Sequence, residues 1–166
     1  MSRSTSRRDF LVQAWRGVGA FLAGTAAWTG YEVLRPFDTG AKKGKIAVGD
    51  PTKFAVGSAT YFPEGGFYVT NAQNHLFALS QKCPHLGCRV PYCKSSGRFE
   101  CACHGSIYDL GGERIAGPTP RGMDQYAGSV EKNNLIVDLS SLTNGPDPGA
   151  KSYYTPSKGP SCIGKA

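Results

Sequence analysis

The sequence is poor in charge and in long apolar runs. Charged residues make up only 19% of the chain, while glycine occurs 22 times and proline 11 times. This composition favours short strands and turns over long helices. At 166 residues the chain is long enough for one compact domain with an anchor or a tail, and too short for two sizeable cores. We therefore expect an all-β head with a single functional site.

Two further features are absent from the sequence: internal repeats and a basic nucleic-acid-binding surface. No internal repeat is visible, so the chain is no solenoid or propeller. The net charge is +7, but residues 1–35 supply +3 of it through five arginines against Asp9 and Glu32, which leaves +4 for the remainder. No basic helix and no interleaving of basic with aromatic residues accompanies that charge. We therefore expect no nucleic-acid partner.

One long apolar stretch is present, from Phe10 to Tyr31, with Arg16 as its only charge. A span of about 20 such residues can cross a bilayer, so residues 1–35 are predicted to form a signal and one transmembrane helix. Arginines precede the stretch, which favours a cytoplasmic N-terminus and a head on the periplasmic side of the cell membrane. No small-residue cleavage site follows the stretch, which predicts a retained anchor.

The segment SRRDFL, residues 6–11, resembles the twin-arginine export signal. That resemblance implies export of a folded protein with its cofactor already bound. The alternative is that the two arginines are only the positive flank of a membrane helix.

The rest of the chain divides by composition. Residues 36–44 mix Pro, Gly and Lys and are predicted to be a flexible neck. Residues 45–142 form the head, where β-branched and aromatic residues predict strands at 45–48, 53–57, 65–71, 75–80 and 97–103 and a hairpin over 126–139. Residues 143–166 are predicted to be an irregular Gly/Pro-rich tail, either mobile or laid over the head through Tyr153 and Tyr154.

Two similar Cys/His motifs carry the chemistry. The first box, CPHLGC, covers residues 83–88, and the second box, CACHGS, covers residues 101–106. Two thiolates and two imidazoles from two loops suit either a tetrahedral zinc site or an iron–sulfur cluster with mixed ligands. A mononuclear zinc site has no need of the further cysteines Cys88 and Cys103, which occupy equivalent positions. Outside the cytoplasm these two can close a disulfide between the boxes.

CPHLGC and CACHGSIYD resemble the two boxes of Rieske iron–sulfur proteins, in particular the branch of cytochrome bc1 and b6f complexes, over about residues 45 to 140. The resemblance implies a Rieske-type antiparallel β-sandwich with a cluster-binding subdomain of loops. It implies one [2Fe-2S] cluster with Cys83 and Cys101 on one iron and His85 and His104 on the other. It also implies a disulfide between Cys88 and Cys103.

The resemblance extends to the surroundings of the cluster. Ser106 and Tyr108 occupy hydrogen-bonding positions, Leu86 the position of an apolar cover, and Gly105 and Pro118 (in GPTP, residues 117–120) complete the expected cluster environment. It implies that His104 is the ring that meets a quinol, with His85 its exposed neighbour.

Some residues depart from the family pattern or fall outside it. Ala102 stands where the family usually has proline, and Cys93 and Cys162 are extra. These two cysteines either form a second disulfide, which we slightly favour, or remain free. His75 lies in a predicted strand and is expected to be an ordinary surface residue.

The resemblance implies an electron-transfer subunit of a quinol:cytochrome c or plastocyanin oxidoreductase, with a cytochrome b subunit, a c-type cytochrome and quinol as partners. One alternative is the small subunit of an exported molybdenum enzyme of the arsenite-oxidase kind. The other is a soluble Rieske ferredoxin or an oxygenase component. An oxygenase needs a second iron site with two histidines and a carboxylate, and only His75 is left for it.

Overall fold

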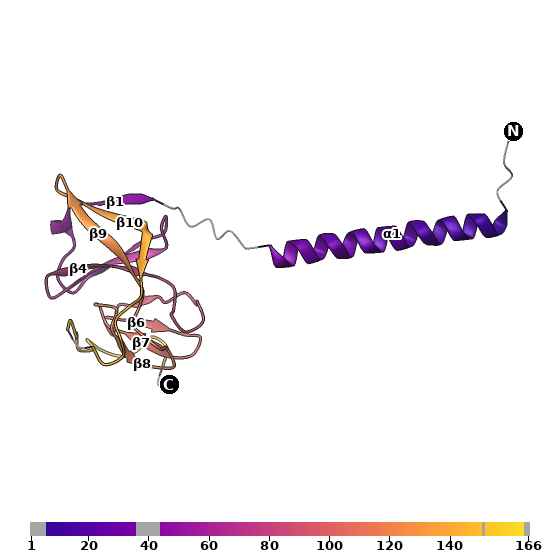
Figure 1. Cartoon of the computed structure of the whole chain (residues 1–166). Coiled ribbons are helices and arrows are strands. Elements are labelled where there is room, and N and C mark those ends of the chain that lie inside the picture. Colours follow the sequence, from indigo (N-terminus) through magenta and orange to yellow (C-terminus); the bar gives the residue numbers. More distant parts are fainter. Residues whose placement is uncertain (1–5, 36–43, 151, 165–166) are drawn as a thin grey trace. The chain divides into compact units, whose positions relative to one another are not determined.

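The computed structural model describes residues 6–35, 44–150 and 152–164, and the chain divides into two compact units, residues 1–39 and residues 40–166. The first unit contains the helix α1, Arg7–Leu34, and the second contains the strands (Figure 1). The predicted neck, residues 36–44, lies outside the described residues except for Gly44.

Helix α1 begins with a capping box. The Ser6 hydroxyl accepts a hydrogen bond from the Asp9 backbone N–H, and the Asp9 carboxylate accepts one from the Ser6 N–H. None of the side chains of α1 is buried. Among the described residues no helix is long and apolar enough to cross a membrane. The predicted helix therefore forms, and Gln13, Arg16 and the glycines and threonines dilute its apolar residues.

The larger sheet of the head has six antiparallel strands in the order β1-β10-β9-β4-β3-β2 (Figure 1). Their bounds are β1 Lys45–Gly49, β2 Ala59–Phe62, β3 Phe67–Ala72, β4 His75–Ser80, β9 Gln125–Glu131 and β10 Asn134–Thr143. Strand β3 is buried along its whole length. Because neighbouring side chains of a strand point to opposite faces, Phe67 and Val69 enter one core while Tyr68 enters a second.

The smaller sheet has four antiparallel strands in the order β5-β6-β7-β8. Their bounds are β5 Tyr92–Cys93, β6 Arg98–Cys101, β7 Ser106–Tyr108 and β8 Arg114–Ala116. The second core packs Phe99 and Tyr108 of this sheet against Tyr68, and it also contains Cys83 and Cys101. Each of the two boxes therefore begins with a cysteine anchored in a packed core.

The prediction of a mostly β head is confirmed, with corrections in detail. Residues 53–57 do not form a strand, because Asp50 caps a short 3₁₀ helix at Pro51–Lys53 and turns follow it. The short strands β2, β5, β7 and β8 were not predicted, since two to four residues carry too little periodicity. The cluster-binding region is more than loops, because the second box joins two strands of the four-stranded sheet: Cys101 ends β6 and Ser106 begins β7.

The tail contains no helix and no strand in its described part after Thr143. It lies on the head instead of extending into solvent, as Figure 1 shows for the yellow segment near β6, β7 and β8. A disulfide joins Cys162 of the tail to Cys93 of β5, and the Lys158 N–H donates to the Ser96 carbonyl at 2.8 Å. Of the two predicted arrangements of the tail, the structure has the one laid over the head.

Candidate metal centre

Both boxes fold into the same kind of turn. The carbonyl of Cys83 accepts a hydrogen bond from the Gly87 N–H at 2.8 Å, and the carbonyl of Cys101 accepts one from the Gly105 N–H at 3.0 Å. The two glycines have φ values of 78° and 73°, which glycine adopts without steric cost. The repeated Cys-x-x-x-Gly spacing thus has a local structural cause, and it places the boxes as two matching loops.

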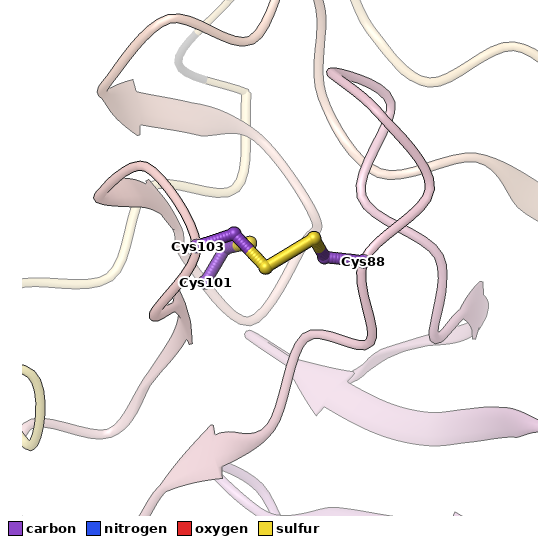
Figure 2. A group of neighbouring side chains, drawn as sticks. All are labelled: Cys88, Cys101 and Cys103. Atoms are coloured by element: carbon purple, nitrogen blue, oxygen red, sulfur yellow. A yellow bond between two sulfur atoms is a disulfide. The ribbon is translucent and has the colours of Figure 1, made fainter.

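A disulfide ties the two loops together. Figure 2 shows the sulfurs of Cys88 and Cys103 bonded, with Cys101 beside them. The sulfur of Cys101 lies within 4.8 Å of both of these sulfurs. Cys83 and Cys101 are the two free cysteines of the described chain, and both are buried. The structure therefore separates the cysteines of the boxes into one oxidised pair and one pair of free thiols.

The two histidines of the boxes lie next to each other. Their ring centroids are 4.9 Å apart and the ring planes are nearly perpendicular, at 89°. His104 is exposed, whereas His85 is half-buried and its Nδ1 atom is buried with no hydrogen-bond partner among the described residues. A buried ring nitrogen without a partner is costly unless a ligand occupies it. His85 Nδ1 is thus placed as a metal ligand would be.

Two hydroxyl groups lie beneath the boxes. The Tyr108 hydroxyl lies 3.2 Å from the Cys83 sulfur, and the Tyr108 side chain is fully buried. Burial raises the pKa of Tyr108, and the nearby Cys83 raises it further, so the phenol remains a hydrogen-bond donor. Burial opposes ionisation of the Cys83 thiol, but hydrogen bonds from Tyr108 and the His85 backbone outweigh it and lower the Cys83 pKa. The Ser106 hydroxyl is buried without a hydrogen-bond partner among the described residues.

The GPTP loop packs against the second box. A Cβ atom on Gly117 would lie 2.4 Å from the Ser106 Cα and 2.7 Å from the Gly105 carbonyl oxygen, so only glycine fits there. The next residue, Pro118, is exposed. Leu86, at the tip of the first box, has 70% of its surface exposed. The two apolar side chains are therefore available at the surface for contact with another molecule.

Comparison with known proteins agrees with this geometry. A model of the Rieske [2Fe-2S] domain matches residues 41–127. The chain belongs to the Rieske [2Fe-2S] family. Two relatives named cytochrome b6-f complex iron-sulfur subunit are each 34% identical to it. The one from Chlorobaculum thiosulfatiphilum is aligned over 79% of this chain and 74% of its own length, and the one from Chlorobaculum tepidum over 81% and 76%.

Solved Rieske structures are also similar. The cyanobacterial plasma membrane Rieske protein of Synechocystis PCC 6803 is 30% identical over 56% of this chain and 98% of its own, with a TM-score of 0.44. A chain of a hyperthermophilic respiratory Complex III is 25% identical over 75% of this chain and 98% of its own, also with a TM-score of 0.44.

This Rieske chain binds one [2Fe-2S] cluster, and the side chains at the boxes fit that group. Two free buried thiols and two adjacent imidazoles are the donor set of a Rieske centre. The unpartnered Nδ1 of His85 and the unpartnered hydroxyl of Ser106 are groups that a bound cluster would satisfy. The structure thus places His85 next to His104 and Cys83 next to Tyr108, while Cys101 lies beside the Cys88–Cys103 disulfide.

Three buried acids near the site were not predicted. Glu100 precedes Cys101 in β6, and Asp109 and Glu113 follow Tyr108; all three are less than 5% exposed. The sequence predicted the strand that contains Glu100 but gave no role to its side chain. Its burial results from tail residues more than 60 positions away, and no local pattern in the sequence indicates that contact.

Proposed function

We propose that the protein is the high-potential electron-transfer subunit of a quinol-oxidising cytochrome complex. It takes one electron and one proton from quinol and passes the electron to a c-type haem protein or plastocyanin. The names of its curated relatives support membership of such a complex. The observation that carries the proposal is the exposed His104 ring beside the half-buried His85 ring, because a quinol needs an accessible imidazole close to the redox centre.

In this proposal Cys83 and Cys101 hold one iron and His85 and His104 hold the other. The bound cluster supplies one-electron redox chemistry, and neutral imidazoles in place of thiolates raise its potential from about −400 mV to as much as about +300 mV. The protein supplies the rest. Tyr108 donates its hydroxyl toward the Cys83 sulfur, which stabilises added negative charge at that sulfur. The fully buried ring of Tyr108 also keeps water from that face of Cys83.

The exposed histidine handles the proton. The His104 ring can accept a hydrogen bond from a quinol hydroxyl, and imidazole is the side chain whose ordinary pKa lies closest to neutral pH. Leu86 offers an apolar contact for the quinol ring at the same end of the head. The Cys88–Cys103 disulfide holds the two loops that carry these groups, since it links the boxes directly.

The partners in this proposal are a cytochrome b subunit and a c-type cytochrome. The head works on the periplasmic side of the cell membrane. Two disulfides, Cys88–Cys103 and Cys93–Cys162, support this placement because disulfides persist in oxidising compartments. The twin-arginine segment supports export of the folded head. We assign residues 36–44 as the tether, 45–142 as the Rieske domain and 143–166 as the tail.

Electron paramagnetic resonance of isolated membranes tests the proposal. Ascorbate is expected to reduce the centre and produce the signal of a reduced [2Fe-2S] cluster, because only a high-potential centre accepts electrons from so mild a reductant. Quinol is expected to reduce it as well. The cytochrome b subunit is expected to co-purify. Three results would overturn the proposal. The centre could be reduced only by dithionite, a molybdopterin subunit could co-purify in place of cytochrome b, or the purified protein could contain zinc and no acid-labile sulfide.

A further inference from the structure

Glu100 is a buried carboxylate with four hydrogen-bond donors, and its side chain is 1% exposed. One oxygen accepts from the Ser96 hydroxyl at 2.6 Å. The other accepts from the Ser161 hydroxyl at 2.8 Å and from the backbone N–H groups of Cys162 at 2.7 Å and Ile163 at 3.3 Å. Three of these four donors belong to the tail. The tail therefore supplies most of the polar environment that replaces water around this carboxylate.

A covalent link lies beside these hydrogen bonds. The disulfide between Cys93 and Cys162 joins the tail to β5, which pairs with β6. The Ser95 hydroxyl also donates to the Pro160 carbonyl at 2.8 Å. Loop closure over a sequence separation of 69 keeps the end of the tail near Glu100 even when single hydrogen bonds break.

A second buried carboxylate holds the beginning of the same segment. Glu113 is 4% exposed and accepts hydrogen bonds from the N–H groups of Ser152 at 2.9 Å and Tyr153 at 3.2 Å. The Tyr153 ring packs on His75 and Phe77, with centroid separations of 4.7 and 4.9 Å. His75 thus contacts the tail and lies apart from the boxes. The segment 152–163 is anchored at both ends by acids of the four-stranded sheet region.

The position of Glu100 in β6 connects the tail to the metal centre. Phe99 and Cys101 point into the core that also contains Cys83. Since side chains alternate along a strand, Glu100 points to the opposite face, where the tail covers it. The tail therefore packs on the back of the strand whose front carries a cysteine of the second box.

We infer that residues 152–163 form a strap that positions strand β6, and with it Cys101, and that Glu100 is the positioning residue of this strap. The inference rests on the proposed function in that Cys101 is taken as a cluster ligand. Glu100 and the strap depend on each other, because a carboxylate is an acceptor only and needs the strap's donors when buried. The bound carboxylate also places a fixed negative charge near the cluster, which disfavours the addition of an electron.

Glu100→Gln in the full-length protein tests the inference. Glutamine keeps one acceptor oxygen but removes the charge and turns an amide N–H₂ toward strap donors. We expect the cluster to be retained, the midpoint potential to rise, and the resonance lines of the reduced cluster to shift or broaden as β6 gains freedom. The matched control is Glu131→Gln, because Glu131 is exposed on β9, where it forms an ion pair with Lys45 at 3.8 Å and accepts a hydrogen bond from the Ser129 hydroxyl at 3.4 Å, with no contact to the tail among the described residues. The control is expected to leave both readouts unchanged.

Two variants in the tail guard against misfolding of the head. Ser161→Ala removes one hydrogen-bond donor to Glu100, and Cys162→Ser removes the disulfide to Cys93. Both residues are exposed and lie far from the boxes in sequence. Release of the strap is measured independently as faster tryptic cleavage after Lys158. We expect faster cleavage together with altered resonance lines in both variants, with the larger change in Cys162→Ser.

The outcomes separate the two proposals. Suppose that the unaltered protein shows a Rieske signal and that the strap is released in the variants. If the midpoint potential and the resonance lines of these variants are nevertheless unchanged, the strap has no effect on the metal centre, and the proposed function remains intact. Cleavage rates equal to those of the unaltered protein in all three variants would overturn the strap itself, whether or not a cluster is bound. Absence of the signal from the unaltered protein counts against the proposed function instead.

Discussion

The hydroxyl oxygen of Tyr108 lies 3.2 Å from the sulfur of Cys83, in the core beneath the two boxes. The phenol keeps its proton because burial raises its pKa, so it acts as a donor toward sulfur over the whole neutral range. A donor at this position stabilises the reduced, more negative state of a cluster held by Cys83. This contact connects the packing of the head to its redox potential.

Tyr108→Phe is expected to lower the midpoint potential by about 60 mV. A hydrogen bond to a charged group contributes roughly 1.5 to 3 kcal/mol, and about 1.4 kcal/mol corresponds to about 59 mV for one electron. Redox titration followed by electron paramagnetic resonance measures the shift. Ser106→Ala is expected to shift the potential in the same direction. Tyr61→Phe, which removes a hydrogen bond to Gln81 instead of to sulfur, is the control; an equal shift in it would contradict this explanation.

Replacing Cys88 and Cys103 together by serine is expected to weaken cluster retention. Their disulfide closes a loop with a sequence separation of 15, for which chain entropy predicts roughly 3 kcal/mol of stabilisation. Visible absorbance during heating reports the temperature at which the cluster is lost, which should fall. If the double variant keeps its cluster up to the same temperature as the unaltered protein, the disulfide does not contribute to cluster retention.

Gly117→Ala is expected to reduce cluster content and thermal stability, because its Cβ would meet the backbone of Ser106 in the second box. Gly149→Ala is a matched control, since Gly149 has φ 92° against 95° for Gly117 and no atom within 4 Å of the added Cβ. Both variants carry the same backbone strain, of roughly 1 to 2 kcal/mol. Iron and sulfide analysis should show a lower cluster content in Gly117→Ala than in Gly149→Ala. Equal loss of cluster in the two variants would show that backbone strain alone, and not contact with Ser106, causes it.

Asp109 is expected to make the head less stable as the pH rises. Its side chain is fully buried, and burial, with the nearby charge of Glu113, raises its pKa from 3.8 to about 6. Between these values the folded state binds more protons than the unfolded state, so the free energy of unfolding falls as the pH rises from about 4 to about 6. The full effect is about 3 kcal/mol at neutral pH.

Asp109→Asn isolates this effect, because asparagine keeps the oxygen that accepts from the N–H groups of Gly111 and Glu113. The melting temperature of the variant, relative to the unaltered protein, should increase between pH 4.5 and pH 7.5. Asp147→Asn, at an exposed position of the tail, provides the comparison. A variant that loses stability equally at both pH values would refute the role of the buried charge.

Much of the site could be predicted from residue identity and spacing. The boxes at 83–88 and 101–106 each combine a cysteine, a histidine and a glycine, and each closes by a hydrogen bond from the glycine to the first cysteine. Because these turns are local, their spacing in the sequence carries over into their geometry. The longer strands β3, β4, β9 and β10 were also predictable, since each has enough β-branched and aromatic residues to stand out.

What the sequence determined by itself was the chemistry of the site: which residue types are present, how they are spaced, and hence that a mixed Cys/His centre forms between two loops. The packing of the tail against the head could be seen only in the folded structure: the tail covers Glu100, and Cys162 pairs with Cys93. Those contacts join positions 62 and 69 residues apart. They depend on how the sheets and the tail pack, which no local pattern of residues encodes.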